Sequence, residues 1–230
     1  MGYIICLIAL ILVSVICILL MPKFRNTKWT NACFLALSFV CYVASLIRIY
    51  SDVGFFDWNF QNALPYANVS PFMFASLLVY AFLPQKAKRY WALLIVLLAP
   101  GMLLSAALGC ISRAAIHYKF HFHFLFDYVA HISLFLFGIY QVRSKQWAPT
   151  KKDCLWSGGT IVGVALLMLI VNLIFGTAFF GLALNEQYNI YNMKIVPNAY
   201  LSALLYFVGL SAVLVAGYFL TLAFRPREKE

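Results

Sequence analysis

Seven apolar runs, separated by short polar segments, make up most of this sequence. The runs cover Tyr3–Leu20, Cys33–Ile47, Leu64–Phe82, Trp91–Cys110, Phe122–Val142, Leu155–Phe175 and Ala199–Phe224. Most are close to the roughly 20 residues that an α-helix needs to cross the hydrocarbon core of a bilayer. Because lipid cannot satisfy backbone polar groups, an isolated run of this kind forms a helix. The sequence therefore predicts an all-α integral membrane protein with seven transmembrane helices in a single domain over residues 1–230.

The composition excludes a separate soluble domain. Of the residues, 64% are hydrophobic and only 10% are charged, whereas about a quarter of a soluble chain is charged. The first run has no basic residue before it and several after it, which is unlike a cleavable signal peptide. We expect it to be retained as the first span.

Two runs contain residues that disturb helices. Pro65 and Pro71 lie near the start of the third run, which predicts an irregular beginning there. Pro100 and Gly101 lie in the middle of the fourth run, where they predict a kink.

The basic residues are distributed unequally between the two sides of the predicted bundle. The net charge is +10, and only Arg48, Arg113, Lys119 and Lys194 of the 17 Lys and Arg residues fall on the side of the N-terminus. Since cytoplasmic segments are enriched in Lys and Arg, the N-terminus is predicted outside and the C-terminus in the cytoplasm. The chain is then a multi-pass cell-membrane protein. Nucleic-acid binding is excluded, because no soluble module carries a basic face with interleaved aromatic residues.

Asp127 and His131 lie four residues apart in the fifth run, on one face of the predicted helix. Ionisable groups at membrane depth are costly and rare, so the pair indicates a functional site. His131 would act as a general base, and Asp127 would orient its imidazole. The alternative is a buried polar pair that holds helices together.

Further polar residues are predicted at a similar depth. Asn68 and Ser70 lie in the third run, and Asn172 and Thr177 lie near the outer end of the sixth. Together with the pair they suggest a pocket between these three spans, open toward the outer leaflet. Ser70 is a candidate nucleophile for His131, or it bonds to backbone as membrane serines usually do. Arg48 would lie at the outer interface, where it could meet a lipid phosphate.

No metal site is predicted. His123, Asp127 and His131 have helical spacing, and imidazole and carboxylate groups can bind zinc, but His123 is expected at the membrane interface, with His117 and His121 before it. The six cysteines show no C-x-x-C spacing and suit buried apolar positions. Phosphate-binding, redox and hydrolase motifs are missing from the sequence, so no cofactor is predicted.

Three segments, in order along the chain, carry a family resemblance. They are LPYANVSPF (64–72), FDYVAHISLFLFGIY (126–140) and VNLIFGTAFFGL (171–182). The first is similar to an L-P-x-x-x-C-x motif, the second to an aromatic span with one inward histidine, and the third to V-N-x-x-x-G-T-N-Y-M-x-L. These motifs belong to a bacterial family of integral membrane proteins called YwaF-like. Its eukaryotic relatives include a transmembrane acyltransferase that acts on ether phospholipids.

The resemblance implies a lipid-acyl site with His131 and Asn172 in it, but the chain departs from the family pattern. Val69 stands where the family's enzymes are expected to carry a nucleophilic cysteine, and G-T-A-F replaces G-T-N-Y. A valine cannot form a thioester, so this route is lost.

The sequence therefore predicts a membrane protein with an outward-facing intramembrane pocket that engages a lipid acyl chain, in a non-catalytic binding or transport role. One alternative is a lipid acyltransferase or hydrolase that uses Ser70, His131 and Asp127. Another is a structural subunit of a membrane complex. Membrane lipids are the expected partners, and a homo-oligomer or a membrane-complex partner stays open.

Overall fold

The computed structural model of the chain describes residues 2–21, 27–53, 69–116, 124–143, 149–175 and 199–224. Within these ranges it is all-helical. The helices are α1 (Gly2–Leu20), α2 (Thr27–Val53), α4 (Val69–Phe82), α5 (Gln85–Ile116), α6 (Phe124–Arg143), α7 (Lys151–Phe175) and α8 (Ala199–Phe224). The predicted all-α fold is thus confirmed for the described residues, and each predicted run overlaps one helix.

Among the residues that the structure describes, four stretches are long and apolar enough to cross a membrane: Gly2–Leu20, Gln85–Leu108, Lys151–Phe175 and Ala203–Phe224. Lys28–Ala44 and Phe72–Phe82 are shorter apolar helical stretches. The described part of the third predicted run begins at Val69, so its expected irregular start at Pro65 lies outside the described residues.

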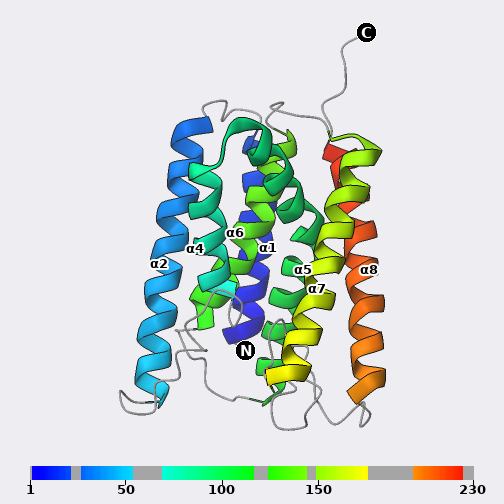
Figure 1. Ribbon diagram of the computed structural model, residues 1–230. Coiled ribbons are helices and arrows are strands. Elements are labelled where there is room, and N and C mark those ends of the chain that lie inside the picture. The colour runs from blue at the N-terminus through cyan, green and yellow to red at the C-terminus, as the bar shows by residue number, and fades with distance from the viewer. Residues whose placement is uncertain are drawn as a thin grey trace.

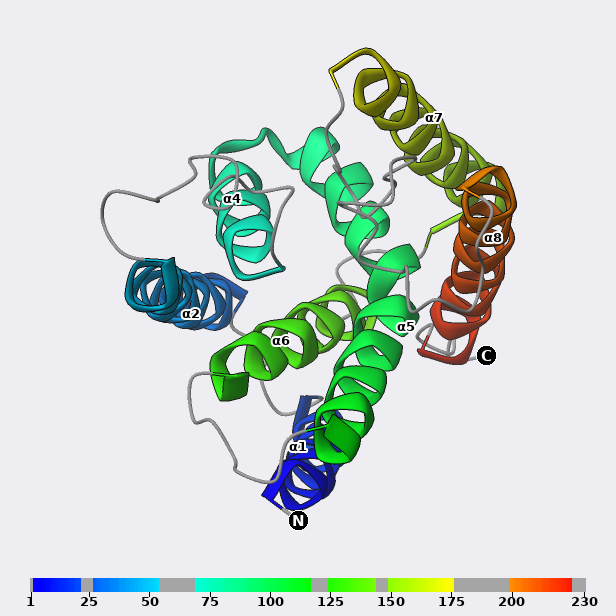
Figure 2. The ribbon, with the colours of Figure 1, turned by 90° about the horizontal axis from the view of Figure 1, so that it is seen from below.

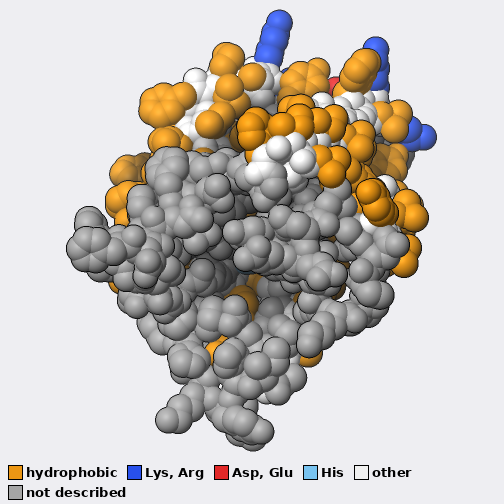
Figure 3. Space-filling model, turned by 60° about the horizontal axis from the view of Figure 1, so that its bottom comes forward, with side chains coloured by type: hydrophobic (Ala, Val, Ile, Leu, Met, Phe, Trp, Pro, Cys, Tyr) orange, Lys and Arg blue, Asp and Glu red, His pale blue; other side chains and the backbone are white. Residues whose placement is uncertain are grey.

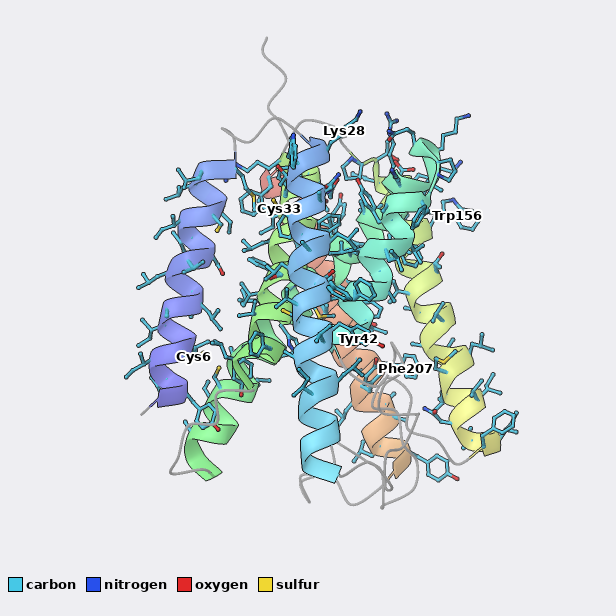
Figure 4. All side chains as sticks on the ribbon, turned by 90° about the vertical axis from the view of Figure 1, so that its left-hand side faces the viewer. Cys6, Lys28, Cys33, Tyr42, Trp156 and Phe207 are labelled. Carbon is cyan, nitrogen blue, oxygen red and sulfur yellow. The ribbon has the colours of Figure 1, made fainter. Side chains whose placement is uncertain are left out.

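Successive helices alternate in direction, so that α1 begins and α8 ends at opposite ends of the bundle (Figure 1). The C-terminal end of the bundle carries the starts of α2, α5 and α7 and the end of α6, where the described basic residues are concentrated. Lys28 marks this end in Figure 4. We call it the basic end, and the end at which α1 begins the N-terminal end.

Helices α5 and α6 form the centre of the bundle (Figure 2). From Ile132 to Val142, every residue of α6 is buried. By contrast, α1, α7 and α8 expose large apolar side chains along their lengths. Figure 3 shows this apolar surface, with Lys and Arg gathered at one rim. Such an exterior suits contact with lipid tails rather than water.

Helix α5 continues through Pro100, and its axis changes direction near the middle (Figure 2). The proline ring removes one backbone hydrogen bond and displaces the preceding turn, which explains the bend. Glycines of the neighbouring helices lie against this part of α5. A Cβ added to Gly138 of α6 would be 3.1 Å from the Val96 Cα, and one added to Gly217 of α8 would be 2.6 Å from the Leu97 Cα. The bend is therefore enclosed by close backbone contacts.

The start of α7 has a reciprocal cap. The Asp153 backbone N–H donates to Thr150 Oγ1 (3.1 Å), while Asp153 Oδ2 accepts from the Thr150 backbone N–H (2.9 Å) and from the Thr150 hydroxyl (2.7 Å). These bonds satisfy backbone donors that the first helical turn leaves without partners.

Candidate functional site

The predicted pair and the candidate nucleophile lie on two different helices. Asp127 and His131 lie one turn apart near the start of α6, and Ser70 belongs to the first turn of α4. Helices α4 and α6 pack against each other and run in the same direction from the N-terminal end (Figure 1). Ser70 and the pair therefore belong to the same end of two neighbouring helices.

The remaining predicted residues are more dispersed. Arg48 belongs to α2 and Asn172 to α7, while Asn68 and Thr177 lie outside the described residues. His123, which has helical spacing with Asp127 and His131, also lies outside the described residues. Within the helices that the structure describes, no three His, Cys, Asp or Glu residues are grouped so that they could hold a metal ion.

His131 is half-buried and engages neighbouring groups. It precedes Gly138 by seven residues, which is about two helical turns, so the two share one strip of α6. Gly138 lies against Val96 of α5. His131 therefore belongs to the same strip of α6 as Gly138, at a level closer to the N-terminal end.

Asn172 is buried, with 4% of its surface exposed. Its helix, α7, packs mainly against α5 and α8. Figure 2 shows α5 between α6 and α7. Asn172 and His131 thus lie on helices that flank α5 from two sides, whereas the sequence suggested a pocket formed directly by the spans that carry them.

A polar network at the basic end was missed by the sequence reasoning. The Tyr80 hydroxyl donates to Gln141 Oε1 over 2.9 Å, and Gln141 Nε2 donates to Asn31 Oδ1 over 3.1 Å. The network connects α4, α6 and α2. Tyr80 and Gln141 are buried, and the Lys88 Nζ lies 5.5 Å from the centre of the Tyr80 ring.

The network is suited to positioning rather than proton transfer. The two hydrogen bonds join neutral amide and hydroxyl groups. The ring of Phe137 packs edge-on against the Tyr80 ring, with 5.2 Å between centres. The network therefore sets the spacing of α2, α4 and α6 at the basic end. The sequence signal for this network is Gln141 alone, a polar residue at the end of an apolar run.

The comparisons with known proteins identify a family. The sequence model of the TMEM164 family matches residues 2–223. Neither the curated proteins nor the solved structures contain a significant match to the chain. Because the match covers nearly every residue, and because the apolar helices agree with a membrane protein, this chain belongs to the TMEM164 family.

Proposed function

We propose that the protein is a multi-pass cell-membrane protein whose bundle engages a lipid acyl chain without transferring it. The observation that carries the proposal is Val69 at the first residue of α4. The YwaF-like resemblance predicts a nucleophilic cysteine at this position. Valine has no nucleophilic atom, whereas the helix pair α4 and α6 is present. A scaffold of this kind that lacks its nucleophile retains the means to bind a lipid.

The proposed lipid site lies at the N-terminal end of α4 and α6. The apolar helix surfaces would hold the acyl chain, and His131 with Asp127 would hydrogen-bond to the polar ester region. Asn68 and Arg48 are further proposed contacts there. The predicted contacts Asn172 and Thr177 are left out of this site, because α7 lies on the other side of α5 from α6. We orient this end toward the outside of the cell, since the basic end then faces the cytoplasm.

Native mass spectrometry of the full chain in detergent tests lipid binding. We expect a phospholipid to be retained, and His131→Ala to lower the retained fraction several-fold. Thr160→Ala is the control, because Thr160 is exposed on α7 and its hydroxyl only donates to the Trp156 carbonyl (2.9 Å). If wild type and His131→Ala retained equal fractions of phospholipid, His131 would not belong to the lipid site. Release of fatty acid or lysolipid would contradict the non-catalytic role.

Acyl transfer is the second candidate, and the first-turn position of Ser70 on α4 favours it. His131 would take the hydroxyl proton while the Ser70 oxygen attacks the acyl carbonyl. The lysolipid oxygen would then leave with that proton, and an acceptor hydroxyl would displace the acyl group from Ser70. Incubation with an alkyne-labelled phospholipid tests this route: it predicts a labelled protein for wild type and none for Ser70→Ala.

The orientation has its own test. Lys86→Cys and Lys152→Cys, at exposed positions of the basic end, are treated in intact cells with a membrane-impermeant maleimide. We expect labelling only after the cells are permeabilised. Labelling of intact cells would reverse the orientation.

A further inference from the structure

Two cysteines from different helices meet near the N-terminal end of the bundle. Cys6 of α1 and Cys110 of α5 belong to one buried cluster with Tyr3 and Tyr128. Their exposed fractions are 9% and 0%. Their thiols are hydrogen-bond partners, and α1 packs against α5. Figure 4 shows Cys6 toward the end of the bundle opposite Lys28.

We propose that Cys6 and Cys110 form a disulfide that fastens α1 to α5. Two cysteines in one buried cluster, on helices that pack against each other, are candidates for such a bond, which needs the two residues to be close neighbours. The bond would lie near the face assigned to the outside, where protein disulfides form and persist. The inference rests on the proposed orientation but not on lipid binding.

The chemistry is thiol–disulfide exchange with a protein disulfide of the exoplasmic compartment. The thiolate of one cysteine attacks that disulfide and forms a mixed disulfide. The second cysteine then attacks the sulfur of the first cysteine in the mixed disulfide, so the Cys6–Cys110 bond forms. The two cysteines are oxidised by two electrons, and the exoplasmic protein leaves as a dithiol that has received both protons. Exchange would precede the docking of α1, since docking buries both sulfur atoms.

The other cysteines provide internal controls. Cys33 is exposed on α2, and Cys154 is buried on α7 at the basic end. Neither belongs to the cluster of Cys6 and Cys110 within the described residues. These two thiols should remain reduced in the same molecules.

Differential alkylation of the full chain tests the proposal. Cells are quenched with acid, the protein is denatured in light N-ethylmaleimide, and thiols released by later reduction receive a heavy isotopic maleimide. We expect heavy label on Cys6 and Cys110, and light label on Cys33 and Cys154. Cys6→Ser should move Cys110 to the light form, whereas Cys33→Ser should change nothing at the pair.

Light label on both Cys6 and Cys110 in wild type would overturn the disulfide. That result would leave the lipid proposal standing, because lipid retention is measured separately by native mass spectrometry. Conversely, heavy label on both residues supports the disulfide even if no lipid is retained. Reduction should also lower the melting temperature of wild type by several degrees and leave that of Cys6→Ser unchanged.

Discussion

Gly217 of α8 lies directly against the backbone of Leu97 in α5: a Cβ added to Gly217 would be 2.6 Å from the Leu97 Cα, and it would also meet the Leu97 carbonyl oxygen. Real side chains do not approach backbone this closely. The absence of a side chain at this position therefore permits α8 to touch the bent part of α5. Small residues serve the same purpose in many membrane helix interfaces, where backbone contact replaces a hydrophobic driving force.

Gly217→Ala should destabilise the protein by about 1–3 kcal/mol, because the new methyl group forces α8 away from α5. The measurement is the free energy of unfolding in detergent micelles titrated with a denaturing detergent. Gly209→Ala on the same helix is the control, since an added Cβ there meets nothing within 4 Å. An unchanged stability for Gly217→Ala would mean that the two backbones are farther apart than described.

The Tyr80–Gln141 hydrogen bond should contribute measurably to stability. Tyr80→Phe removes the donor, and Gln141→Met removes the acceptor with little change in volume. In a double-mutant cycle we expect a coupling of about 0.5–1.5 kcal/mol, the range found for hydrogen bonds between membrane helices.

The matched control for this cycle combines Tyr80→Phe with Ser211→Ala. The Ser211 hydroxyl is exposed on α8 and donates within its own helix to the Phe207 carbonyl over 2.8 Å. These two changes should add without coupling. Additivity in the Tyr80–Gln141 cycle as well would show that the bond does not hold α4 to α6.

The sequence was sufficient to predict the helices but not their neighbours. Apolar runs marked each helix because lipid imposes one type of secondary structure. The ends were less accurate: α5 begins at Gln85 rather than Trp91, since the basic residues before the run are helical although they are not apolar. The Asp127–His131 spacing was readable because both residues belong to one helix. Gln141 and Asn31 are 110 residues apart, and a single sequence contains no signal that pairs them.

The cap of α7 provides a local prediction. Thr150→Ala removes the hydroxyl that accepts from the Asp153 N–H and donates to its carboxylate. The loss of a threonine cap typically costs about 1 kcal/mol, so the same unfolding titration should show a decrease of that size. Thr160→Ala, which affects only a hydroxyl bond within α7, should have a smaller effect. If the two variants were equally stable, the cap would not contribute to folding.

Val69→Cys tests whether the first residue of α4 decides between binding and transfer. If the YwaF-like resemblance places this residue at the nucleophile position, then the cysteine would attack a bound acyl ester, with His131 as the base. We expect the variant to acquire a label from an alkyne-tagged phospholipid, and neutral hydroxylamine to remove the label because it cleaves thioesters. Val69→Ala should remain unlabelled.

The double variant Val69→Cys/His131→Ala separates proximity from catalysis. Labelling should fall strongly in it, since an unassisted thiol is largely protonated at neutral pH. Full labelling of the double variant would remove His131 from the role of base. Absence of label in Val69→Cys, with lipid still retained, would show that the chain binds its lipid with the ester group away from the start of α4.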